Sequence, residues 1–188
     1  MNEIDELTTS DSTASAAVNK ILAELVAPRI IHAAKGLSGY GFDLEEQTLL
    51  THAIAVYSKL LGPRHPLIAD FNTYLADCYL REQETYDVRP LLVEAQSIYA
   101  DAKGNNDRST IKATLRLGQV DRDENRFDLA KPELEAALEK AKKYYPDTYL
   151  IIQCLNSYAD FCGQTGDKPK ADRFFAEAKA LSNKSPLR

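Results

Sequence analysis

Histidine and cysteine side chains are the residues of this chain that could bind a transition metal. They are His32, His52, His65, Cys78, Cys154 and Cys162. Metal sites usually pair such ligands a few residues apart, but the sequence has no Cys-x-x-Cys or His-x-x-x-His pair. We therefore expect no metal site. Because a disulfide framework normally uses an even number of cysteines, we expect three reduced thiols in the core.

The glycine-rich stretch at residues 36–41, Gly-Leu-Ser-Gly-Tyr-Gly, is the other segment that could bind a ligand. A phosphate-binding loop follows a strand and carries a lysine. This stretch follows a predicted helix and has no such lysine, which indicates a turn. No serine, histidine and acidic residue share a recognisable catalytic setting. We therefore predict a protein that is not an enzyme and needs no cofactor.

Composition narrows the classes of partner. The 188 residues are 44% hydrophobic and 27% charged, which is ordinary for a globular protein, and the net charge is −5. A negative surface opposes non-specific attraction to nucleic acid or anionic lipid. The first residues lack the features of a secretory signal, and no stretch reaches the roughly 18 apolar residues of a membrane span. We therefore expect a cytoplasmic protein with no nucleic-acid or membrane partner.

Apolar residues recur at helical spacing along most of the chain, and no segment alternates with period two for long. We expect an all-α protein, with a helix from residue 14 that breaks or kinks near Pro28. Asp43 and Glu46 resemble a capping box, and Pro66 suits the first turn of a helix. The further helices are predicted at residues 44–59, 67–81, 86–102, 110–122, 127–142, 148–162 and 169–181.

The helical pattern repeats. Four residue pairs stand 42 positions apart in one register: Ala76 with Gly118, Val88 with Ala130, Pro90 with Pro132, and Ala95 with Ala137. Helical hairpins that recur at such a period indicate an α-solenoid, in which each hairpin buries its apolar face against its neighbours. The small residue at position 118 predicts a close approach of two helices there.

The residues at these positions resemble the tetratricopeptide repeat. The matching residues are Leu75-Ala76, Tyr79, Leu92 and Ala95 in one unit, and Leu117-Gly118, Phe127, Leu134 and Ala137 in the next. The period and the phrase Leu-Gly-Pro-Arg-His-Pro at 61–66 are similar to the kinesin light chain variant. Departures are Asp121, where the family has an aromatic residue, and Pro90 and Pro132, which we expect inside second helices with a local bend.

The resemblance implies an architecture and a class of function. We expect a right-handed superhelix of about four hairpins, in a solenoid domain over residues 14–182. Residues 1–13 are predicted to be disordered, and residues 183–188 to be flexible. The implied function is that of a non-enzymatic adaptor or scaffold, which binds a partner protein or peptide.

In tetratricopeptide solenoids the first helix of each hairpin lines a concave groove. The resemblance therefore implies these groove residues: Ile31, Lys35, Asp70, Thr73, Asp77, Arg81, Lys112, Leu115, Arg116, Gln119, Arg122, Asn156, Asp160 and Gln164. Asn156 matches the asparagine that such repeats use to hold a peptide backbone. Arg81, Lys112, Arg116 and Arg122 would repel one another unless an anion is near.

A second hypothesis is a structural protein that assembles with itself. Solenoids usually end in a polar capping helix, and we predict no such helix after residue 181. The last predicted helix carries a candidate self-association surface and would support a homodimer. Its residues are Phe174, Phe175, Ala178 and Leu181.

Overall fold

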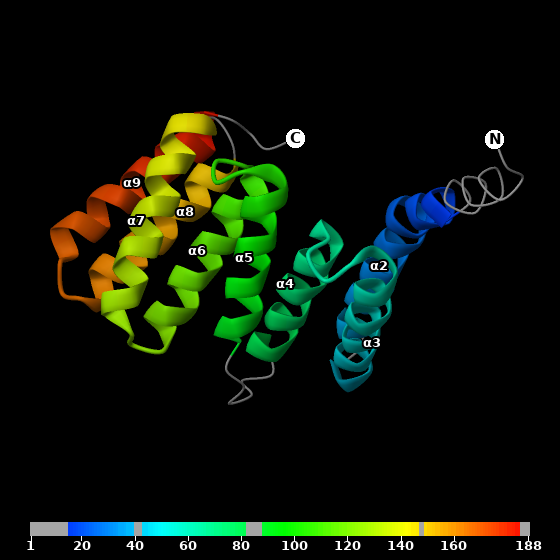
Figure 1. Cartoon of the computed structure of the whole chain (residues 1–188). Coiled ribbons are helices and arrows are strands. Elements are labelled where there is room, and N and C mark those ends of the chain that lie inside the picture. Colours follow the sequence, from blue (N-terminus) through cyan, green and yellow to red (C-terminus); the bar gives the residue numbers. More distant parts are fainter. Residues whose placement is uncertain (1–14, 40–42, 82–87, 147–148, 185–188) are drawn as a thin grey trace, which may run out of the picture. The chain divides into compact units, whose positions relative to one another are not determined.

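A computed structural model describes residues 15–39, 43–81, 88–146 and 149–184 (Figure 1). The chain divides into two compact units, Met1–Tyr86 and Asp87–Arg188, and each is considered by itself. The predicted disorder of residues 1–13 lies outside the described residues. No helix within the described ranges has the length and apolar character needed to cross a membrane.

The described part of the first unit consists of successive helical segments. Residues 15–21 are helical, and the π-helical turn η1 (Leu22–Val26) leads directly into α2 (Ala27–Gly39). The predicted interruption near Pro28 is this π-helical turn, because the chain stays helical through the proline itself. Because helix precedes Pro28 without a break, its missing N–H removes a hydrogen bond to the preceding turn. The helices α3 (Asp43–Leu61) and α4 (Pro66–Arg81) follow.

The start of α3 differs from the predicted capping box. The Glu46 side chain is buried and forms an ion pair with Arg81 of α4. This carboxylate therefore links two helices, although its spacing from Asp43 suggested a cap. Pro66 is the first residue of α4, as predicted.

Small and aromatic side chains fill the core of the first unit. Ala34 of α2 and Ala53 of α3, which stand 42 residues before Ala76 and Ala95 in the repeat register, are buried. Tyr57 of α3 packs against Phe71 of α4, with ring centroids 5.4 Å apart. These contacts bury one face each of α2, α3 and α4, and apolar burial of this kind is the main source of their stability.

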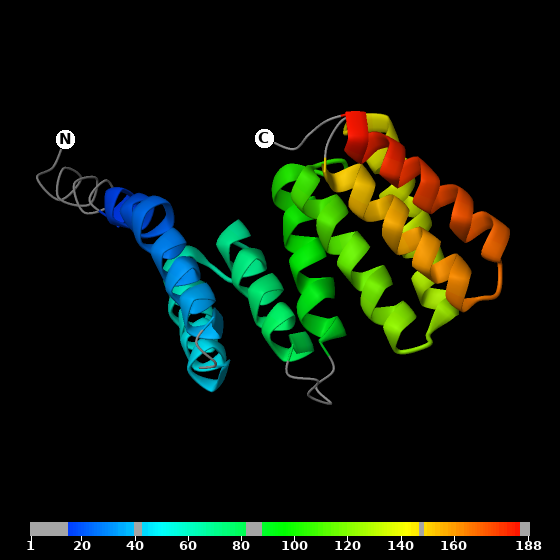
Figure 2. The same ribbon diagram turned by 180° about the vertical axis from the view of Figure 1, so that it is seen from behind.

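The second unit consists of α5 (Arg89–Lys103), α6 (Arg108–Asp123), α7 (Phe127–Tyr144), α8 (Tyr149–Gln164) and α9 (Lys168–Lys184). In sequence order, each of these helices packs on the next, and α6 also lies beside α8 (Figures 1 and 2). The described residues contain no strand, which confirms the all-α class. The helix α9 extends two residues into the predicted flexible end.

The close approach predicted at Gly118 is present between α6 and α7. A Cβ atom at this position would lie 2.7 Å from Cγ of Leu134 and 3.1 Å from its backbone nitrogen. Ala130 and Ala137, one turn or so on either side of Leu134, are fully buried. Small side chains therefore let these two helices pack tightly, as the repeat pattern requires.

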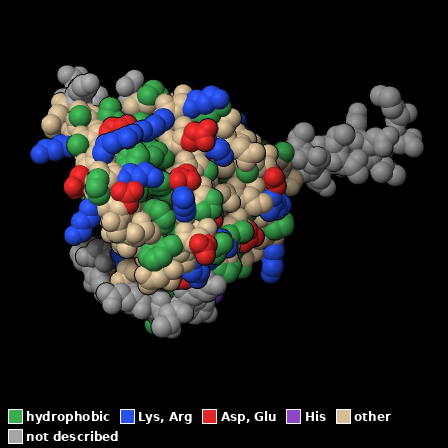
Figure 3. Space-filling view, turned by 90° about the vertical axis from the view of Figure 1, so that its left-hand side faces the viewer, with side chains coloured by type: hydrophobic (Ala, Val, Ile, Leu, Met, Phe, Trp, Pro, Cys, Tyr) green, Lys and Arg blue, Asp and Glu red, His purple; other side chains and the backbone are tan. Residues whose placement is uncertain are grey.

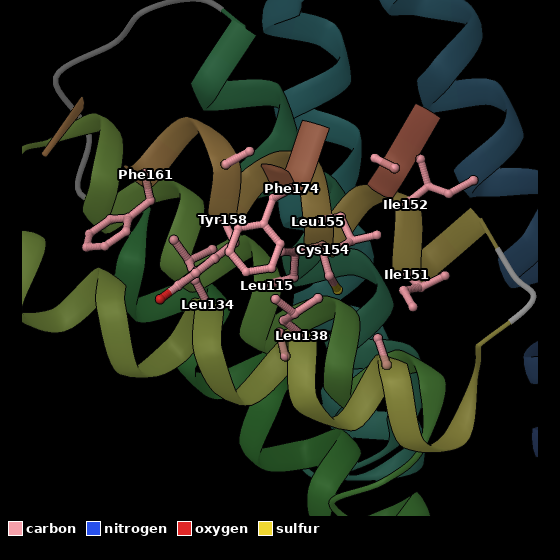
Figure 4. Close-up of a cluster of buried hydrophobic side chains, with 14 of the residues drawn as sticks. Leu115, Leu134, Leu138, Ile151, Ile152, Cys154, Leu155, Tyr158, Phe161 and Phe174 are labelled. Atoms are coloured by element: carbon pink, nitrogen blue, oxygen red, sulfur yellow. The ribbon is translucent and has the colours of Figure 1, made fainter. Parts of the chain in front are cut away.

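The aromatic side chains of Tyr158, Phe161 and Phe174 lie among the aliphatic side chains of the core near α8 and α9 (Figure 4). The ring of Tyr158 meets Phe174 edge-on at a centroid distance of 5.1 Å and stacks on Phe161 at 5.9 Å. Phe127 packs edge-on against Phe161 from the start of α7. The last two hairpins thus share one continuous hydrophobic core.

Pro90 and Pro132, which stand one repeat apart, occupy different positions in their helices. Pro90 lies in the first turn of α5, so the prediction of an interior position was wrong, and its missing N–H costs nothing there. Pro132 lies inside α7, as predicted. At this position the proline removes the hydrogen bond that the carbonyl of Asp128 would otherwise accept.

Candidate protein-binding surface

Four of the predicted groove residues lie exposed on α6 and α8 of the second unit. They are Lys112, Asn156, Asp160 and Gln164. The helices α6 and α8 are the first helices of successive hairpins, and they lie beside each other. We call the surface that carries these side chains, where α6 and α8 lie beside each other, the shared face.

Half-buried side chains form a hydrogen-bonded row between the two helices. Nη1 of Arg116 donates to Oε1 of Gln119 at 3.3 Å, and Nε2 of Gln119 donates to Oγ of Ser157 at 2.6 Å. The amide of Gln119 thus spans from α6 to α8. This row fixes the orientation of the side chains at the base of the shared face.

Arg122 is held at the end of this row by several acceptors. Its Nη1 donates to the carbonyl of Ser157 at 3.3 Å and to Oδ2 of Asp160 at 3.4 Å. Its Nε donates to Oδ1 of Asp123 at 2.8 Å. The expected repulsion among basic residues therefore does not apply to Arg122, because two carboxylates balance its charge.

The prediction that Leu115 lines the groove was wrong. Its side chain is only 4% exposed and belongs to the hydrophobic core of the second unit. The position faces α7 and α8 rather than solvent, because the buried stripe of α6 is wider than the spacing pattern suggested. The side chain packs in the core beneath this surface, so it cannot contact a partner.

The predicted groove residues of the first unit are largely engaged within that unit. Nζ of Lys35 lies 4.5 Å from the ring centroid of Tyr74, a cation–π contact from α2 to α4. Oγ1 of Thr73 donates to the carbonyl of Ala69 at 2.8 Å. Arg81 is paired with Glu46. The three remaining residues, Ile31, Asp70 and Asp77, are half-buried.

The predicted self-association surface is mostly buried. Phe174 is 7% exposed and Ala178 is 2% exposed, and both belong to the core shared with α8. Leu181 packs against that core, which leaves Phe175 as the exposed member of the set. The prediction was wrong for Phe174 and Ala178, because α8 covers more of α9 than the sequence pattern implied.

The end of the second unit where α7 and α9 lie carries charges of both signs. On this face, hydrophobic side chains are interspersed with Lys, Arg, Asp and Glu (Figure 3). Lys142 of α7, for example, pairs with Glu177 of α9 at 2.8 Å. Opposite charges at contact distance suit a solvated surface.

A buried ionic cluster was missed by the search for functional residues. Asp121 of α6 is fully buried, and both its oxygens accept from Nε of Arg89, at 3.1 and 3.0 Å. Nε of Arg126 also donates to its Oδ1, at 2.7 Å. Its only sequence signal was an acidic residue at a position where the resembled family has an aromatic one.

Glu133 of α7 completes this cluster on one side. Nη2 of Arg89 donates to its Oε1 at 3.3 Å. Burial raises the pKa of Glu133 to about 7; the neighbouring Asp121 adds to this rise, and Arg89 and Arg126 oppose it. On the other side, Arg126 also pairs with the half-exposed Glu124.

The three cysteines are buried free thiols, as predicted. Burial raises the pKa of Cys154 to about 12 and also raises the pKa of Cys162. A thiol that stays protonated is a poor nucleophile and a poor metal ligand. No group of three potential metal ligands gathers within the described ranges.

No protein-family model and no curated protein sequence matches the chain. Solved structures do match. The structure of BtubC (BKLC) from P. vanneervenii superimposes with a TM-score of 0.75 at 14% identity, over 96% of this chain and 77% of that one. The chain has a tetratricopeptide-like repeat fold.

Two further structures with this repeat fold are similar. A Podosopora anserina protein, described as a kinesin light chain with nearly identical TPR-like repeats, gives a TM-score of 0.72 at 18% identity, over 86% of this chain and 76% of that one. A MamA structure gives 0.55 at 17% identity, over 98% and 96%. At such identities the likeness establishes the tetratricopeptide-like fold alone, and it agrees with the resemblance seen in the sequence.

Proposed function

We propose that this protein is a scaffold that binds a partner protein or peptide across the shared face of α6 and α8. Tetratricopeptide-like repeat folds generally serve protein interaction and are typically non-enzymatic. The surface residues proposed to contact the partner are Lys112, Arg116, Gln119, Asn156, Asp160 and Gln164.

The observation that carries this proposal is that some side chains on that face are held by hydrogen bonds while others are exposed. Gln119 and Arg122 are held in place by hydrogen bonds between the two helices. Lys112 and Asn156 are exposed, and the described residues provide no hydrogen bond or ion pair for either. A fixed base with free polar groups above it lowers the entropy lost when a partner is bound.

The chemistry of the polar groups on this face indicates what they bind. The amide of Asn156 can donate and accept at once, which suits the N–H and C=O groups of an extended backbone. Lys112 and Arg116 bring positive charge to the N-terminal half of the face. We infer a partner segment whose backbone lies along α8 and whose acidic side chains lie near α6.

Charge reversal on this face tests the proposal. The full-length protein is immobilised, and proteins retained from an extract of its native cells are compared by mass spectrometry. The double variant Lys112→Glu with Arg116→Glu should lose at least tenfold of the specifically retained partner. The charge-matched control Lys131→Glu with Lys179→Glu, exposed on α7 and α9, should retain it. Equal retention by both double variants would place the binding surface elsewhere.

A further inference from the structure

The buried ionic cluster of the second unit joins three helices and lies apart from the proposed binding residues. Its members are Arg89, Asp121, Glu124, Arg126 and Glu133. Arg89 belongs to the first turn of α5, Asp121 to α6 and Glu133 to α7, while the other two lie in the turn between α6 and α7. The cluster is therefore a cross-link that holds the start of α5 against the next hairpin.

The charges of this cluster do not balance. Among the described residues of the cluster, three carboxyl groups face two guanidinium groups, so their full ionisation leaves one negative charge in excess. The Asp121 side chain has no exposure, and that of Glu133 is 19% exposed. An uncompensated charge in such surroundings is costly, and a carboxyl group there tends to take up a proton instead. One bound proton would make the cluster neutral.

The contacts indicate which carboxyl group takes the proton. Asp121 accepts hydrogen bonds from two guanidinium groups, an arrangement that suits a carboxylate. Glu124 is 41% exposed and can be solvated by water. Oε2 of Glu133 is buried, and no group in the described part of the chain hydrogen-bonds to it. Glu133 is thus the least stabilised as an anion.

We propose that Glu133 is a proton-operated clasp, which holds α5 against α6 and α7 when it is protonated and loosens α5 when it is ionised. The protonated carboxyl donates a hydrogen bond to the Asp121 carboxylate, while Oε1 still accepts from Arg89. On ionisation that hydrogen bond is lost and two carboxylates repel each other. The charged groups acting on Glu133 are Asp121 from α6, Arg89 from α5 and Arg126 from the turn.

The sign of the pH effect follows from the direction of the shift. The pKa of Glu133 is higher in the folded state, at about 7, than its ordinary value of 4.5. The stabilisation is therefore fully present below the ordinary value and is lost as the pH rises through about 7. Between pH 6 and pH 8 the equilibrium constant for docking of α5 should fall about tenfold.

Hydrogen exchange of the full-length protein tests the clasp. Protection factors of the α5 amides are measured at pH 6, 7 and 8 and corrected for the intrinsic exchange rate. In the wild type they should fall about tenfold over this range. In Glu133→Gln, which resembles the protonated form, they should stay constant. The control Glu139→Gln, exposed on α7, should behave as the wild type.

Two results would overturn the clasp: wild-type protection that does not change with pH, or a Glu133→Gln variant that keeps the wild-type dependence. If Glu133→Gln fails to fold, measurements on the wild-type protein still test the clasp. An NMR titration of the wild-type Glu133 side-chain carboxyl should give a midpoint above pH 6. A midpoint below pH 6 would show that the carboxyl is ionised throughout the range and would exclude the mechanism.

Discussion

The absence of a side chain at position 118 sets the distance between α6 and α7. A Cβ atom there would overlap with Cγ and Cδ2 of Leu134, at 2.7 and 2.8 Å. We expect Gly118→Ala to lower the free energy of unfolding by about 1–3 kcal/mol through overpacking. Chemical denaturation monitored by circular dichroism measures this.

Gly163, on α8 of the same unit, provides the control. A Cβ atom there meets no atom closer than 4.0 Å. Because alanine also forms helices better than glycine, Gly163→Ala should leave stability unchanged or raise it by up to about 1 kcal/mol. Equal effects of the two substitutions would mean that α6 and α7 are farther apart than described.

The sequence predicted individual residues well where the repeat register dictates their size. Gly118, Ala130 and Ala137 were correctly placed at helix contacts. It failed for Leu115, which the family resemblance put in the groove, and for Phe174, which the pattern of the last predicted helix put on a surface. Spacing defines the direction of a side chain around its own helix, but burial also depends on how far the neighbouring helices extend over it.

At the scale of the helix, α7 carries an interior proline whose cost can be measured. Pro132→Ala restores an N–H that can donate to the carbonyl of Asp128. We expect the free energy of unfolding to rise by about 1–2 kcal/mol, since part of the gain is offset by a more flexible unfolded chain.

Pro90 is the matched position one repeat earlier, but it lies in the first turn of α5. Pro90→Ala restores no helical hydrogen bond, so it should leave stability unchanged or lower it by about 0.5–1 kcal/mol. If Pro132→Ala destabilises as much as Pro90→Ala, the proline in α7 is not interrupting a hydrogen bond, and the helix must begin later than Phe127.

The positions of the helices could be predicted closely because apolar periodicity and turn residues determine them locally. The predicted segments 127–142 and 169–181 correspond to α7 and α9. Pro28 predicted an interruption, but not that it would take the form of a π-helical turn at Leu22–Val26. The role of Glu46 could not be predicted, because its carboxylate pairs with Arg81 of another helix at a sequence separation of 35 residues.

At the scale of the whole molecule, the second unit contains its own hydrophobic core. Every residue of the core cluster, from Ile111 to Leu181, lies within that unit. We therefore expect the fragment 87–188 to fold by itself. Circular dichroism should show a predominantly helical spectrum with a cooperative thermal transition, and a gradual, non-cooperative loss of signal would contradict an independent core.

The central claim is that this tetratricopeptide-like scaffold binds a protein across the face shared by α6 and α8. The most direct test places a photo-crosslinking amino acid at Asn156, exposed on that face, and separately at Lys179, exposed on α9. Each variant is irradiated in its native cells, and the adducts are identified by mass spectrometry. The account predicts a discrete protein adduct from position 156 and none from position 179. An adduct formed at position 179 but not at position 156 would contradict it.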